Sequence, residues 1–87
     1  MGYSLRILAS ARRELERLPA VAQQDVRHAI RGLAHDPRSP GARILSGAGA
    51  ERIWRIRKGD YRVLYEVDDD RPVVLVIRIA HRREVYR

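Results

Sequence analysis

Hydrophobic and polar residues recur with two different periods along the chain, and these periods predict its secondary structure. Residues 3–8 alternate between polar and apolar side chains, which is typical of a strand. Residues 10–18 are predicted to form a short amphipathic helix with Ser10 as its N-cap. Glu14 is expected to pair with Arg17 on the wet side of this helix. A proline then separates it from a second helix, whose apolar stripe consists of Ala22, Val26, Ala29, Ile30 and Leu33.

The C-terminal part of the chain changes to the two-residue period of strands. Three runs there are rich in β-branched and aromatic residues: residues 52–58, 61–67 and 73–80. The turns that join them are short, so consecutive runs are expected to pair as antiparallel neighbours. The predicted order is β-α-α-β-β-β. This order defines a single α+β domain over residues 1–87, an antiparallel sheet with a two-helix hairpin packed on one face.

Strand alternation separates the apolar side chains from the arginines. Two helices cover only one face of a sheet, so the apolar sets of the strands must face the helices. In the last strand this set is expected to be Val73, Leu75, Ile77 and Ile79, and Trp54, Tyr61 and Tyr65 are predicted in the core of the other two strands. The remaining alternate positions then project from the opposite face: Arg55, Arg57, Arg62 and Arg78.

The placement of the turns predicts that these arginines form a basic patch. Arg62 should lie near Ile77 and Arg78, and His81 and Arg82 should emerge at the same end of the sheet. The acidic residues 68–70 should lie about 20 Å away at the other end, which exceeds the Debye length of about 8 Å at physiological salt. The predicted patch comprises Arg55, Arg57, Arg62, Arg78, His81 and Arg82. The alternative is a solvated sheet face with cross-strand charge pairs.

The composition favours an anionic partner and argues against several other classes of protein. The chain has 87 residues with 18 Lys and Arg against 11 Asp and Glu, a net charge of +7, and Lys58 is its only lysine. Arginine presents a planar donor fork that suits phosphate, although a GC-rich genome would also enrich it. There is no cysteine, and the three histidines are scattered, so neither a disulfide nor a metal site is expected. No apolar run is long enough for a membrane span or a signal peptide, so a cytoplasmic protein is expected.

Two stretches of the sequence resemble a known family. The run from Trp54 to Tyr65, Trp-Arg-Ile-Arg-Lys-Gly-Asp-Tyr-Arg-Val-Leu-Tyr, resembles the central hairpin of the RelE/ParE superfamily of bacterial toxins. Residues 78–86, Arg-Ile-Ala-His-Arg-Arg-Glu-Val-Tyr, resemble the RelE-type C-terminus. The opening strand, the first helix and the segment around residues 44–47 agree with the same family. The resemblance therefore covers essentially the whole chain.

This resemblance implies the toxin of a type II toxin–antitoxin module with a RelE-like fold. RelE-like toxins enter the ribosome and cleave mRNA by attack of a ribose 2′-hydroxyl on the adjacent phosphate, with no metal or other cofactor. A cognate antitoxin blocks the site in a hetero-oligomeric complex. ParE-like members instead inhibit DNA gyrase and generally lack the His/Arg/Tyr ending seen here. A catalytically inactive member that only binds an antitoxin is a third possibility.

The resemblance also implies roles for individual residues. Arg55 and Arg57 occupy positions where the family contacts the RNA, and Arg78 joins them as a predicted RNA-binding residue because it shares their face. The predicted catalytic residues are Arg62, His81, Arg82 and Tyr86. Arginine cannot act as the base because its pKa exceeds about 12, so His81 or Tyr86 is expected to move the proton, and the sequence does not decide between them. Alanine at Arg62 or Arg82 is expected to leave the fold intact, because both lie outside the apolar face.

Overall fold

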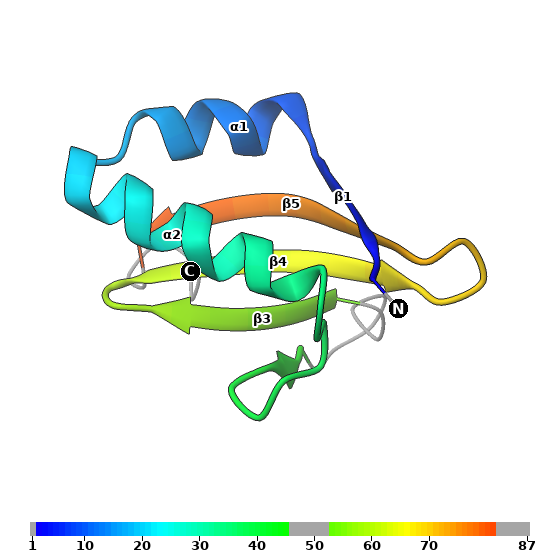
Figure 1. Cartoon of the computed structure of the whole chain (residues 1–87). Coiled ribbons are helices and arrows are strands. Elements are labelled where there is room, and N and C mark those ends of the chain that lie inside the picture. The colour runs from blue at the N-terminus through cyan, green and yellow to red at the C-terminus, as the bar shows by residue number, and fades with distance from the viewer. Residues whose placement is uncertain (1, 46–52, 82–87) are drawn as a thin grey trace.

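The computed structural model describes residues 2–45 and 53–81. Seven elements follow one another: β1 (Ser4–Ile7), α1 (Ala9–Glu16), α2 (Ala20–Leu33), β2 (Arg43–Ile44), β3 (Ile53–Lys58), β4 (Tyr61–Asp68) and β5 (Val73–His81). The strands form one sheet in the order β1-β5-β4-β3-β2, and both helices lie over the same face of it (Figure 1). The predicted α+β class with a helical hairpin on one face is confirmed. The two-residue strand β2 is an addition that the sequence pattern did not predict.

The sheet is mixed, because β1 runs parallel to β5 while the other pairs are antiparallel. The sequence predicts an antiparallel sheet from its short turns, and those turns do join antiparallel neighbours. They carry no information about β1, whose partner lies at the other end of the chain. β1 pairs with the first half of β5 only, from Ser4 opposite Val73 to Ile7 opposite Val76.

The helices bury the apolar stripes that the sequence predicts. Ala11 and Leu15 of α1 are buried, as are Val26, Ile30 and Leu33 of α2. The start of α1 differs from the prediction: the helix begins at Ala9, and Leu8 is its N-cap in an extended conformation with no side-chain capping bond. Ser10 therefore lies inside the first turn, because the chain leaves β1 directly into the helix.

A β-bulge in β5 changes which of its side chains face the helices. Tyr65 pairs with Val76 and Leu64 pairs with Arg78, so Ile77 has no partner in β4. Before the bulge Val74 and Val76 are fully buried. The predicted inward set of Val73, Leu75 and Ile77 is therefore wrong, whereas Ile79, beyond the bulge, is buried as predicted. A bulge inserts one residue and so reverses the alternation of a strand, which no single-strand pattern reveals.

Hydrogen bonds tie the loop between α2 and β2 to the sheet. The hydroxyl of the fully buried Tyr65 donates to the carbonyl of Pro37 at 2.6 Å, and burial raises the pKa of Tyr65 to about 12. Next to Pro37, Arg38 binds both carboxylate oxygens of Asp69, at 3.0 and 2.7 Å. The Arg38 guanidinium also lies 5.5 Å from the ring centre of Trp54. Contacts with Tyr65, Trp54 and the β4–β5 turn thus fix the position of this loop.

Candidate functional site

The face of the sheet opposite the two described helices carries an arginine from every strand. Ile56, Val63 and Ile79 are aligned across β3, β4 and β5 and belong to the core beneath the helices. Their neighbours along each strand project from the opposite face, because side chains alternate. We call the following set the arginine face: Arg6, Arg43, Arg55, Arg57, Arg62 and Arg78.

The strand register arranges this face in three rows. The middle row runs across the sheet as Arg43, Arg55, Leu64 and Arg78. The row nearer the β3–β4 turn consists of Arg57, Arg62 and Ala80. The third row, nearer the β4–β5 turn, consists of Ile53, Glu66, Leu75 and Arg6. Most of the positive charge therefore lies in the two rows away from the β4–β5 turn.

Arg57 and Arg62 are directly opposite each other in the register of β3 and β4. Like charges at such a cross-strand pair destabilise a sheet, and a bound phosphate can bridge two guanidinium groups. The two side chains differ in environment, because Arg57 is exposed whereas Arg62 is only 5% exposed. This burial changes the expectation for Arg62→Ala, which removes a buried side chain rather than a surface one.

Arg78 is held from the side by the first helix. Its Nε lies 3.8 Å from Oε2 of Glu14, and Oε1 of the same carboxylate accepts the backbone N–H of Ile79 at 2.9 Å. The predicted pair between Glu14 and Arg17 is thus replaced by a contact with β5. The reason is that β1 ends at Ile7, so α1 lies along the outer edge of β5 beyond that point.

His81 lies on the other face from the arginines. It pairs with Tyr61, two residues beyond the buried pair of Ile79 and Val63, so the register turns it to the helix side. Its ring packs edge-on against Tyr61, with 5.7 Å between ring centres. The predicted single patch is therefore wrong in this respect: His81 is at the expected end of the sheet but not on the arginine face. Arg82 and Tyr86 lie outside the described residues.

Two other expectations about the patch can be compared with the structure. Arg62 pairs with Ala80, not with Ile77 or Arg78 as predicted, because the β4–β5 turn is centred beyond Asp69, between Asp68 and Val73, and the bulge adds one more residue to β5. The acidic residues 68–70 begin at the far end of β4, whose last residue is Asp68, as predicted. There, hydrogen bonds from Arg38 and Tyr3 lower the pKa of the Asp69 carboxyl to about 2.

Sequence reasoning missed two members of the arginine face, Arg6 and Arg43. The signal for Arg6 was present, since it lies between Leu5 and Ile7, which both pack against the core. Arg43 lay in a segment with no predicted strand, and only its pairing with Arg55 reveals its place. The Arg43 guanidinium also donates to the carbonyls of Pro40 and Ala42, at 2.9 and 3.0 Å, which fixes its position at the sheet edge.

Within residues 2–45 and 53–81 there is no group of three or more His, Cys, Asp or Glu side chains that could hold a metal ion. No helix in this part of the chain is long and apolar enough to cross a membrane. The described site consists of guanidinium groups on a sheet face, with the imidazole of His81 at the same end of the sheet.

Such a small basic α+β domain is found among bacterial protein toxins, and comparison of the sequence identifies the family. The family model described as "ParE toxin of type II toxin-antitoxin system, parDE" matches residues 5–86. The chain belongs to this family of type II toxins, and the resemblance to the RelE/ParE superfamily is confirmed.

Two curated relatives and several solved structures are similar over nearly the whole chain. Toxin RelG of Mycobacterium tuberculosis is 34% identical over 91 residues, which cover 100% of this chain and 99% of RelG. Toxin RelE of the same organism is 36% identical over 86 residues, which cover 98% of this chain and 87% of that protein. Both relatives are toxins by name.

The fold is also that of solved RelE structures. In the toxin–antitoxin complex RelBE2 of Mycobacterium tuberculosis, a chain superposes with a TM-score of 0.83 at 28% identity, covering 93% of this chain and 99% of the other. The isolated Escherichia coli RelE toxin gives a TM-score of 0.77 at 26% identity, with 97% and 90% covered. The RelE–RelB complex of Pyrococcus horikoshii gives a TM-score of 0.80 at 25% identity, with 94% and 97% covered.

Proposed function

We propose that this toxin is a ribosome-dependent mRNA endonuclease that arrests translation and growth. The observation that carries the proposal is the arginine face, on which every strand of the sheet supplies at least one guanidinium group. Guanidinium forks bind phosphate oxygens in pairs, so a row of them suits an RNA backbone. The similarity to RelG and RelE over nearly the full chain supports the same function.

The proposed reaction is transfer of the scissile phosphate from the 5′ oxygen of one nucleotide to the 2′ oxygen of the preceding one. The ribose 2′-hydroxyl loses its proton to a base and attacks phosphorus, and the 5′ oxygen leaves with a proton from an acid. The products are a cyclic phosphate and a free 5′-hydroxyl, so no oxidant or water is consumed. Arg57 and Arg62, opposite each other, stabilise the charge that develops on the phosphate oxygens. The mechanism uses no metal ion.

His81 is the described residue near this end of the sheet best suited to move one of these protons, because an imidazole ring both accepts and donates protons. Tyr86 and Arg82 remain the other predicted members of the site. Since His81 lies on the helix side of β5, RNA bound along the arginine face would reach it by crossing the end of the sheet beyond Arg62 and Ala80. The edge-on contact with Tyr61 restricts rotation of the imidazole there.

The proposed partners are the ribosome with its mRNA and a cognate antitoxin in a hetero-oligomeric complex. Two of the similar chains were solved within complexes, RelBE2 of Mycobacterium tuberculosis and RelE–RelB of Pyrococcus horikoshii. The first of these is a toxin–antitoxin complex. A ribosomal target places the proposed action in the cytoplasm.

The proposal is tested with the purified toxin in a translation reaction that contains ribosomes and a defined mRNA. Primer extension should reveal cuts within the translated region, and no cuts in the same mRNA without ribosomes. A single 2′-deoxy substitution at the mapped position should abolish the cut, because the attacking hydroxyl is removed. Intact mRNA in the presence of a folded toxin that arrests growth would exclude the nuclease.

Inhibition of DNA gyrase is the second candidate function, because the matching family model is named for ParE. A supercoiling assay with purified gyrase separates the two candidates. Loss of supercoiling with intact mRNA would assign the protein to the gyrase inhibitors. The two curated relatives, RelG and RelE, favour the nuclease.

A further inference from the structure

A cavity of about 880 Å³ lies at the end of the arginine face nearer the β4–β5 turn. We call it the turn-end cavity. Several of its lining side chains belong to two adjacent rows of that face: Arg6, Glu66, Asp68, Val73 and Leu75. Val73 and Leu75 are partly buried and form an aliphatic floor. The cavity thus combines an aliphatic floor with side chains of both charges.

Two opposite charges border the cavity without pairing with each other. Glu66, Leu75 and Arg6 occupy one row across β4, β5 and β1. Neighbouring strands of a sheet lie about 4.8 Å apart, so the Cα atoms of Glu66 and Arg6 are about 10 Å apart. Within residues 2–45 and 53–81, neither side chain takes part in an ion pair. A carboxylate and a guanidinium group therefore lie on the two sides of an aliphatic residue.

Two other acidic residues of the lining have partners, whereas Glu66 has none among the described residues. Oδ1 of Asp68 accepts two backbone N–H groups of the β4–β5 turn, at 3.0 and 3.2 Å. The carboxylate of Asp69 accepts hydrogen bonds from two side chains, Tyr3 and Arg38. Glu66 is partly buried, its cross-strand neighbours Ile53 and Leu75 are apolar, and no described residue hydrogen-bonds to its side chain. Its two carboxylate oxygens are therefore available to a ligand.

This arrangement of groups is complementary to a guanine nucleotide. An ionised carboxylate only accepts hydrogen bonds, and guanine is the RNA base whose Watson–Crick edge presents two adjacent N–H donors. Adenine and cytosine present one donor beside an acceptor nitrogen, and the single donor of uracil lies between two carbonyl groups. Apolar side chains cover the faces of bases in sites that read this edge, and a guanidinium group binds phosphate. Glu66, Leu75 and Arg6 thus offer one group to each part of the nucleotide.

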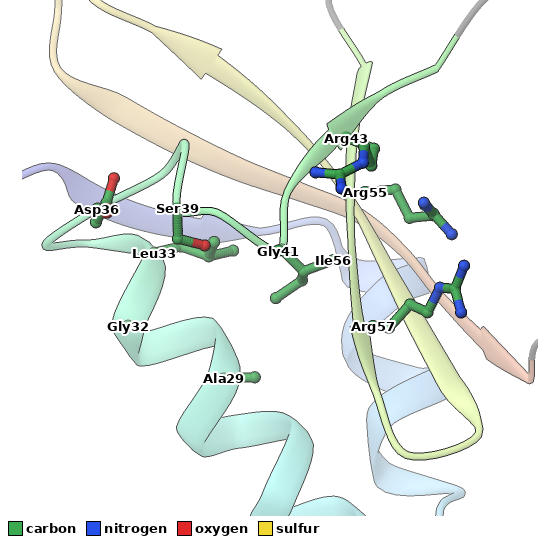
Figure 2. Close-up of a pocket in the computed structure, with 10 residues that line it drawn as sticks. All are labelled: Ala29, Gly32, Leu33, Asp36, Ser39, Gly41, Arg43, Arg55, Ile56 and Arg57. Carbon is green, nitrogen blue, oxygen red and sulfur yellow. The ribbon is translucent and has the colours of Figure 1, made fainter.

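The turn-end cavity lies on the same face as the arginines of the proposed site. Figure 2, which shows a smaller cavity of about 510 Å³ beside α2, shows Arg55 and Arg57 extending away from that helix. Glu66 shares their face, because it pairs with Ile53, two residues before Arg55. Glu66 follows Arg62 by four residues along β4, which corresponds to about 13 Å. An RNA strand bound to the arginines would therefore reach the cavity a short distance from the proposed cut.

We propose that the turn-end cavity binds a guanine nucleotide of the mRNA, with Glu66 as the residue that selects the base. The Glu66 carboxylate accepts both N–H groups of the Watson–Crick edge, Val73 and Leu75 cover the base, and Arg6 binds a phosphate. This inference rests on the proposed function, because it requires mRNA to bind along the arginine face. The toxin itself then contributes to the choice of the cut site.

The binding test uses isotope-labelled toxin and a short oligouridine RNA with one central guanosine. The expected result is a saturable change in the amide signals of Arg6, Glu66 and Leu75. Adenosine in place of the guanosine should weaken binding about tenfold, and inosine, which lacks the 2-amino group, should give an intermediate affinity. Equal binding of the guanosine and adenosine RNAs, changes confined to other residues, or tighter binding of a short arginine-rich peptide to the same residues would overturn the proposal.

A pair of variants tests the carboxylate directly. Glu66→Ala removes the acceptor oxygens and should bind the guanosine and adenosine RNAs with equal affinity. Asp70→Ala removes the same charge from an exposed residue of the cavity lining and should keep the preference for guanosine. Thermal unfolding checks that both variants fold, and Glu66→Gln gives a milder replacement if Glu66→Ala does not. An unchanged preference in folded Glu66→Ala contradicts the proposal.

Cleavage gives a second readout that is separate from binding, so the two proposals fail independently. In the translation reaction, cuts by the wild type should favour guanine at one fixed position relative to the cut, and Glu66→Ala should lose that preference. A toxin that selects the guanosine RNA but cuts no mRNA would refute only the nuclease. Cuts with the same base preference in the wild type and Glu66→Ala would refute only the role of Glu66.

Discussion

Glu14 of α1 accepts a hydrogen bond from the backbone N–H of Ile79, with 2.9 Å between its Oε1 and the nitrogen. Its other carboxylate oxygen lies 3.8 Å from Nε of Arg78. Directly after β1, the N–H of Leu8 donates to the carbonyl of Val76 in β5. Beyond that point, the edge of β5 is bound by the Glu14 side chain of α1 instead of by a neighbouring strand. Glu14 thus supports the part of β5 that follows the bulge and leads to His81.

Glu14→Ala should lower the free energy of unfolding by about 1 to 2 kcal/mol, because it leaves the Ile79 N–H without its charged acceptor. Glu14→Gln keeps an acceptor oxygen and should lose less. Urea unfolding followed by circular dichroism measures both. Glu16→Ala, an exposed residue of the same helix, is the matched control and should change stability by less than about 0.5 kcal/mol. Equal losses in the alanine and glutamine variants would show that the hydrogen bond contributes nothing.

Arg62 and Arg57 face each other across β4 and β3 but should respond differently to alanine. Arg62 is 5% exposed, so Arg62→Ala should lower the free energy of unfolding by about 1 to 3 kcal/mol. Arg57→Ala should change it by less than about 0.5 kcal/mol. Both should reduce mRNA cleavage, which is measured well below the unfolding temperature of the weaker variant. Full cleavage by folded Arg62→Ala would remove it from the catalytic residues.

Contacts between the arginine face and RNA should appear in the salt dependence of binding. For single-stranded nucleic acid, each phosphate contact adds about 0.7 to the slope of log affinity against log salt concentration. Arg57→Ala should reduce the slope by about that amount and weaken all RNA sequences alike. Arg12→Ala, on the exposed side of α1, is the control. If Arg12→Ala reduced the slope and Arg57→Ala did not, the RNA would bind the helical side of the protein and not the arginine face.

Asp69 should make the protein sensitive to acid. Hydrogen bonds from Arg38 and Tyr3 lower its pKa from 3.8 to about 2. The unfolded chain therefore binds the proton first, so the stabilisation is complete above about pH 4 and is lost as the pH falls towards 2. Asp69→Asn should flatten the stability profile in this range, and Asp70→Asn should not. Identical acid profiles for the wild type and Asp69→Asn would contradict the structure.

Tyr65 should make the protein sensitive to alkali. Its pKa is raised from 10.0 to about 12 because the buried phenol resists ionisation. The unfolded chain loses this proton first, so stability should fall as the pH rises from about 10 to 12. Tyr65→Phe should abolish that component but cost about 1 kcal/mol at neutral pH, because the Pro37 carbonyl loses its donor. Unfolding by urea at several pH values tests both effects.

Local periodicity was sufficient for the order of the main elements, the helical hairpin and the face of Arg55, Arg57, Arg62 and Arg78. These features depend on alternation along one strand or helix, and a side chain's face follows from its neighbours in sequence. The resemblance to a toxin family likewise rested on contiguous residues.

The remaining features depend on contacts between distant parts of the chain. The bulge at Ile77 turned Val74 and Val76 towards the helices, the end of β1 made room for Glu14, and a two-residue strand brought Arg43 to the sheet. The burial of Arg62 and the turn-end cavity beside Glu66 also arise only when the strands are assembled into the sheet. Strand register and the ends of strands are decided by packing between elements, and a one-residue shift turns every following side chain to the other face.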